Sequence, residues 1–100
     1  MIEFKENDII SLKLVSGEEV IGKFKSKTSD TTTIEKALVM MNGPQGLAFG
    51  TFFATANSDN GIDILNDKLM SIGLTNNKVK EEYARVTSSI AQAPKKTIIT

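Results

Sequence analysis

The chain lacks cysteine, histidine and tryptophan, and Tyr83 is its single tyrosine. Without cysteine there are neither disulfides nor thiolate metal sites. Without histidine the commonest general base and the commonest transition-metal ligand are both missing, and no carboxylate pair stands out in their place. The sequence therefore predicts a protein that is not an enzyme and that has no catalytic residues, no cofactor and no metal.

Net charge is absent as well, because twelve basic and twelve acidic residues cancel among the 100 residues. Any binding of nucleic acid must then come from a local patch. No apolar run has the length that spans a bilayer, and the N-terminus MIEFKENDII carries acidic residues where a signal peptide carries basic ones. These features predict a single cytoplasmic domain with no membrane partner.

Apolar and polar residues alternate over much of the chain, as they do in β-strands. Five to six strands are predicted: two within residues 8–24 around a turn at Ser16-Gly17, and others over 31–41, 47–55, 62–65 and 69–72. Phe49, Phe52 and Phe53 in the fourth of these read as core or interface residues rather than as a ligand surface.

After Gly73 the apolar period becomes helical. Val79, Tyr83, Val86 and Ile90 fall on one face of the predicted helix, and this face docks on the sheet or, alternatively, on a partner. Thr75 is the predicted N-cap. Pro94 ends the helical region, and residues 95–100 form either a loose tail or one more strand.

The stretch GEEVIGKF, residues 17–24, nearly matches the nucleotide-binding P-loop G-x-x-x-x-G-K-[ST]. Phe24 stands where the P-loop has a metal-binding hydroxyl, and Glu18 and Glu19 would repel phosphates. The alternation also continues past Lys23, where a P-loop begins a helix. A β-hairpin is therefore favoured over a nucleotide site.

The same hairpin resembles the first motif of the Sm and Sm-like (LSm) family, through Leu14, Gly17, Val20, Gly22 and Phe24. Residues 32–37 and 62–72 are similar to the later strand and the second motif of that family, so the resemblance covers roughly residues 8 to 73. More narrowly, the chain resembles short Sm-like proteins of tailed phages that infect marine cyanobacteria.

This resemblance implies a mainly β fold, a small and strongly bent five-stranded Sm-like barrel over residues 1–73. A C-terminal α-helix of the same domain, 74–91, and a tail, 92–100, would follow. Sm-like subunits close into homo-oligomeric rings, and the expected pairing edges are residues 47–55 and 69–72. The number of subunits does not follow from the sequence. A phage protein of this kind would act in the host cytoplasm.

The family holds RNA bases with residues of both motifs, but the matching positions here carry Thr28, Thr32, Asn66 and Asp67, and the loop offers no aromatic group for stacking. The resemblance therefore implies a ring that binds RNA weakly and without uridine preference. The candidate RNA-binding residues are Thr28, Asp30, Thr32, Asn66 and Lys68 near the pore, and Lys23, Lys25 and Lys27 on backbone phosphates.

Competing interpretations remain for these residues. Lys13, Lys23, Lys25 and Lys27 predict one basic stripe on the outward face of adjacent strands, and a plain solvated face is the alternative. Asp59, Asp63 and Asp67 recur every four residues without the order of a calcium loop, which favours turn residues over a metal site. The alternative function is a scaffold ring that holds a phage or host protein.

Overall fold

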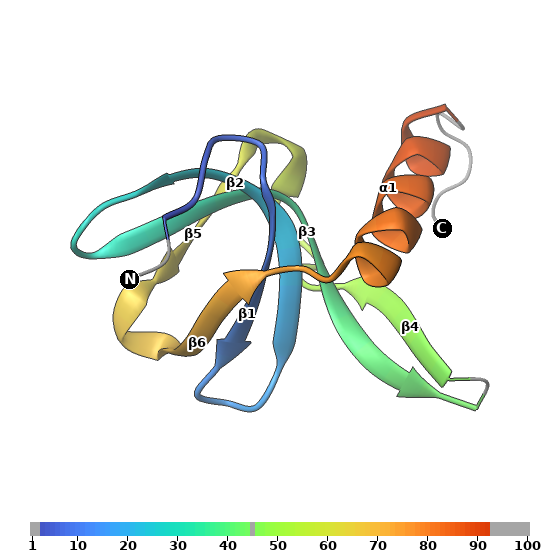
Figure 1. Ribbon diagram of the computed structural model, residues 1–100, viewed down its shortest axis with the longest axis horizontal. Coiled ribbons are helices and arrows are strands. Elements are labelled where there is room, and N and C mark those ends of the chain that lie inside the picture. Colours follow the sequence, from blue (N-terminus) through green and yellow to red (C-terminus); the bar gives the residue numbers. More distant parts are fainter. Residues whose placement is uncertain (1–2, 45, 93–100) are drawn as a thin grey trace.

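A computed structural model describes residues 3–44 and 46–92 (Figure 1). One antiparallel sheet contains six strands, and a helix follows them. The elements are β1 Ile9–Leu14, β2 Glu19–Lys27, β3 Thr31–Gly43, β4 Gly46–Thr51, β5 Ile62–Leu65, β6 Leu69–Leu74 and α1 Asn77–Gln92, with 3-10 helices η1 Ser58–Asn60 and η2 Asn66–Lys68. The predicted mainly β chain with a C-terminal helix is confirmed. The expected tail lies, except for Gln92, outside the described residues.

The strand order is β4-β3-β2-β1-β6. β5 lies off this path and, like β4, pairs with β3. Six strands agree with the five to six predicted from alternation and exceed by one the five-stranded barrel that the resemblance implied. Residues 52–61 lie outside the sheet, so the strand predicted over 47–55 ends at Thr51. Within the described residues no ladder joins β4 to β6, so the sheet has two open ends. Figure 1 shows the β3–β4 hairpin and α1 on the right, with the other strands curling round on the left.

A bulge in β3 explains why β5 and β4 pair with different parts of this strand. Between the pairs Ile21–Leu38 and Lys23–Glu35, β2 contributes only Gly22 while β3 contributes both Lys36 and Ala37. The extra residue bends the strand and increases its twist. The first part of β3, residues 31–34, pairs with β5, and its last part, residues 38–43, pairs with β4.

The β1–β2 turn has the predicted position. Gly17 has a φ of 100°, which favours glycine, and the Leu14 amide donates to Glu18 O at 2.9 Å. β2 then continues as a strand through Lys27. The hairpin interpretation of residues 17–24 is confirmed, and the helix that a P-loop needs after Lys23 is not formed.

The main core lies on one face of the bent sheet. It contains Ile10, Leu12, Leu14, Val20, Phe24, Ile34, Ala37 and Ile64, with Phe4, Phe52, Ile62, Leu69 and Ile72 packed against it. Phe52 therefore has the predicted packing role, whereas Phe53 is 47% exposed. Burial of these side chains is the main favourable term in the stability of the sheet.

Helix α1 covers the opposite face near the bend. Ile21 pairs with Leu38 and Met40 with Phe49, so these four residues share that face, and the Phe49 ring lies 6.3 Å from the Tyr83 ring. Tyr83 is 2% exposed, while Val79 and Val86 are half-buried. The predicted docking face of the helix is confirmed for these three residues. The side chain of Ile90 lies outside the described part of the chain.

The predicted N-cap is wrong by one residue. Thr75 follows the end of β6 and is still bonded to β1, because its amide donates to Ile9 O and its hydroxyl hydrogen-bonds Ser11 Oγ at 2.8 Å. Asn76 caps the helix instead, with its side-chain Oδ1 accepting from the Val79 amide at 2.9 Å.

Gly22 offers a direct test of the bend. A Cβ at this position would lie 2.8 Å from Ile34 Cδ1 and 3.2 Å from the backbone oxygen of Glu35. We expect Gly22→Ala to lower the free energy of unfolding by about 1–3 kcal/mol, measured by urea denaturation. Gly73→Ala is the matched control, since nothing lies within 4 Å of its Cβ position. Equal stability of the two variants would contradict the close approach at Gly22.

Candidate functional site

Four of the predicted RNA-binding residues meet at one end of the sheet. Thr28 and Asp30 lie in the β2–β3 turn, Thr32 lies at the start of β3, and Asn66 opens η2. Asn66 is more than thirty positions from the other three in the chain, yet it accepts a hydrogen bond from Thr32. The antiparallel pairing of β5 with β3 brings the turn and η2 together. We call this group the turn cluster.

Asn66 holds the turn cluster together. Its Oδ1 accepts a hydrogen bond of 2.7 Å from the Thr32 hydroxyl, and its Nδ2 donates to Thr28 O at 2.9 Å. Its backbone amide donates to Asp30 O at 2.8 Å. Thr32 is fully buried, so its hydroxyl needs this partner. These contacts fasten η2 to the hairpin and occupy the groups that would otherwise read a base.

The Thr28 side chain stabilises the β2–β3 turn. Its Oγ1 accepts from the amides of Asp30 and Thr31 at 3.1 and 3.0 Å, a side-chain contact that stabilises tight turns. The side chain of Asp30 is exposed and negative, which is unfavourable beside a phosphate. The polar atoms of the turn cluster are therefore used mainly within the chain.

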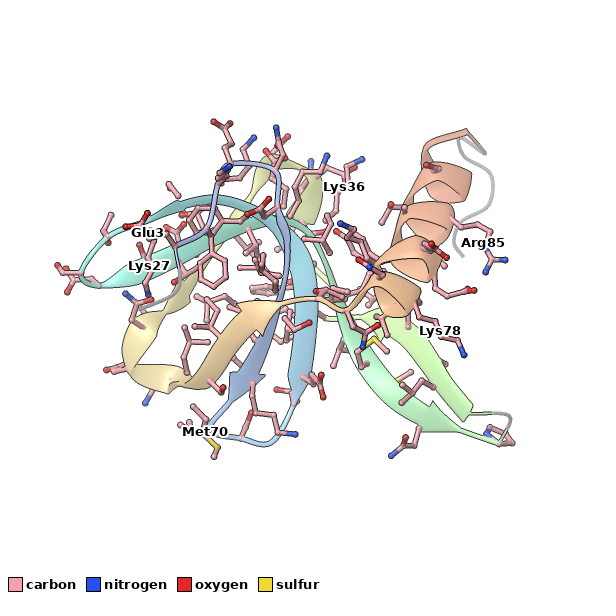
Figure 2. The ribbon with its side chains drawn as sticks, in the orientation of Figure 1. Glu3, Lys27, Lys36, Met70, Lys78 and Arg85 are labelled. Carbon is pink, nitrogen blue, oxygen red and sulfur yellow. The ribbon has the colours of Figure 1, made fainter. Side chains whose placement is uncertain are left out.

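Two lysines flank the turn cluster. Lys27 reaches back along the hairpin, and its Nζ donates to the Thr32 hydroxyl at 3.4 Å (Figure 2). Lys68, at the end of η2, is exposed, and its backbone oxygen accepts from the Val15 amide at 2.8 Å. These two ammonium groups are the cations that a phosphate at this end of the sheet would meet.

The predicted basic stripe is interrupted by the register of β2. Lys23 pairs with Glu35 on one face, whereas Lys27 pairs with Thr32 on the face of the main core. A register shift at Lys25 causes the change, because one extra residue moves every later side chain to the other face. Alternation in the sequence alone could not reveal this shift.

Lys25 is held by carboxylates. Its Nζ lies 2.9 Å from Glu6 and 3.8 Å from Glu35. The hydrogen bond between Glu6 and Lys25 raises the pKa of the lysine and lowers the pKa of the glutamate. Since Glu35 is also the cross-strand neighbour of Lys23, the positive charge of this region is largely balanced locally.

Sequence reasoning missed Lys36, which lies at the bulge of β3 with a φ of 56°. The one available signal was the break in alternation at Glu35-Lys36, where two polar residues follow each other. Within the described residues there is no group of three or more acidic side chains placed to hold a metal ion. The described part of the chain also contains no helix with the length and apolar character needed to cross a membrane.

Comparison with models of known protein families found no match, and comparison with curated proteins found none either. The features of this chain that bear on its function are therefore the turn cluster, the lysines beside it and the strand edges. The resemblance of residues 8–73 to Sm-like sequences adds an expectation about assembly.

A double-mutant cycle tests the structural role of the turn cluster. Thr32→Val and Asn66→Ala remove the two ends of one hydrogen bond, and we expect a coupling energy of about 0.5–3 kcal/mol in urea denaturation. Thr33→Val is the control partner for Asn66→Ala, because the Thr33 hydroxyl donates to Asp63 instead. Additive effects of Thr32→Val and Asn66→Ala would show that the cluster does not act as a unit.

Proposed function

We propose that the protein is a non-enzymatic, Sm-like ring-forming protein whose copies join through β4 and β6. The observation that carries this proposal is that both ends of the sheet are open and apolar. In the described residues β4 pairs only with β3, and β6 pairs only with β1. Leu47 on β4 is 66% exposed, and Met70 and Leu74 on β6 are 68% and 59% exposed.

Open edges of this kind favour pairing with another chain, because their unpaired amides and carbonyls form a template for one more strand. The nominated segments 47–55 and 69–72 overlap the two end strands of the sheet. When β4 of one copy pairs with β6 of the next, the contact is head-to-tail, and it closes into a ring if the rotation allows. Met70 points away from the body in Figure 2, where a neighbour would cover it.

Charged substitutions at the edges should break the assembly. We expect Leu47→Lys and Met70→Lys each to convert the oligomer to monomers in light scattering coupled to gel filtration, since each places a cation in an apolar strand contact. Val15→Lys is the control, because Val15 is 56% exposed but lies in the β1–β2 turn. A wild-type protein that stays monomeric in dilute solution would end the proposal.

For the ring we propose RNA as a weakly bound ligand. The support is the position of Lys27 and Lys68 beside the turn cluster, with Thr28 and Asp30 at the exposed tip. Since Asn66 and Thr32 bond each other, contact would be made with phosphates rather than with bases. Such binding is sensitive to salt and has little base preference.

Titration of oligo-U, oligo-A and mixed RNA at low salt tests this ligand. We expect similar weak affinities for the three, lost when Lys23, Lys25 and Lys27 are all changed to alanine. Among single variants, Lys27→Ala should weaken binding more than Lys25→Ala, whose ammonium is paired with Glu6. Lys78→Ala, on the exposed face of α1, is the control. Strong preference for oligo-U would contradict phosphate-only contact.

A protein-interaction scaffold is the second candidate function. The observation that favours it is the balance of charge around Lys25, together with the internal use of the polar atoms in the turn cluster. A ring of this type would hold a phage or host protein in the host cytoplasm. Oligomers that bind none of the three RNAs would favour the scaffold over RNA binding.

A further inference from the structure

Lys36 has a backbone conformation that a lysine rarely adopts. Its φ of 56° lies in the left-handed region, which is unfavourable for a residue with a side chain because Cβ lies too close to the following carbonyl oxygen. The Tyr83 hydroxyl holds this conformation by donating to Lys36 O at 2.7 Å, and burial raises the pKa of Tyr83 so that the donor stays protonated. Strained residues and bulges occur often at binding sites, where they direct a side chain.

The strained lysine borders two adjoining hollows. One, of about 390 Å³, lies between the β3 bend, the end of β4, η1 and α1. The other, of about 250 Å³, lies under α1 and also contains Lys23. Lys36 and Thr87 line both of them. Figure 2 shows Lys36 between η1 and α1. We call the larger hollow the bend cleft.

The bend cleft combines one cation and one carboxylate with hydroxyl groups around them. Among the described side chains Lys36 forms no ion pair. Asp59 lies in the larger hollow with the hydroxyls of Thr51 and Ser58. The Thr87 hydroxyl donates to Tyr83 O at 2.9 Å, which leaves its oxygen free to accept from a ligand.

We propose that the bend cleft binds a small hydroxylated organic anion, of the size and chemistry of a sugar phosphate. The anionic group meets Lys36, and the hydroxyl groups of the ligand donate to Asp59 and Thr87, all of which line the same hollow. An anion without hydroxyls would leave the Asp59 carboxylate unpaired beside it, and a neutral sugar would leave Lys36 without a partner. The hollow of about 390 Å³ falls within the range of small-molecule sites. This site is separate from the turn cluster, and it adjoins the end of β4 through Thr51.

Isothermal titration calorimetry on the full chain tests the proposal, with ribose 5-phosphate as the probe and with ribose and inorganic phosphate as comparisons. We expect ribose 5-phosphate to bind with a Kd of about 1 mM or tighter and at least about tenfold more tightly than either comparison compound. Lys36→Gln should weaken binding about tenfold, because a charge-assisted hydrogen bond is lost. Asp59→Asn should weaken it less.

Lys78→Gln on the exposed face of α1 is the matched control and should bind as the wild type does. Circular dichroism of each variant separates loss of the site from loss of the fold. No heat with ribose 5-phosphate, equal binding of ribose or phosphate, or unchanged binding by folded Lys36→Gln would each overturn the proposal. None of these variants alters β4 or β6, so light scattering on each variant shows separately whether ring formation has changed.

Discussion

β3 changes direction at Lys36, and through this change one strand pairs with three others. Gly22 on β2 admits the bulge because it has no side chain to meet Ile34, and Tyr83 on α1 holds the bulged backbone through the Lys36 carbonyl. The bend directs residues 31–34 towards β5 and residues 38–43 towards β4. The position of β4 and of the bend cleft beside α1 follows from it.

The two faces of the sheet carry different contacts as a consequence. The main core fills one face, while the opposite face is covered near the bend by α1 through Tyr83 and Phe49. At the far end of β3 the turn cluster ties η2 to the hairpin by the hydrogen bonds of Asn66. Among the described residues the buried side-chain polar atoms are hydrogen-bonded, while the two ends of the strand order, β4 and β6, each pair with one strand only, which is why assembly is the leading proposal.

Periodicity in the sequence predicted the strands, the turn at Gly17 and the helix, because alternation and helical spacing report which side chains a local element can bury. The joining of residues 28–32 with 66–68 came from motif resemblance, and strand pairing places these segments together. The helix cap was misplaced because Thr75 keeps a hydrogen bond to β1, a contact that no local pattern encodes.

The composition and the alternation of residue types were enough to establish a mainly β chain with a terminal helix, since both are properties of short segments. Tertiary contacts alone decided the faces of Lys23 and Lys27, the left-handed backbone at Lys36 and the internal use of the Asn66 amide. Each of these depends on a register shift or on a partner distant in the chain. These features result from the packing of several elements against one another, so no local pattern of residues specifies them.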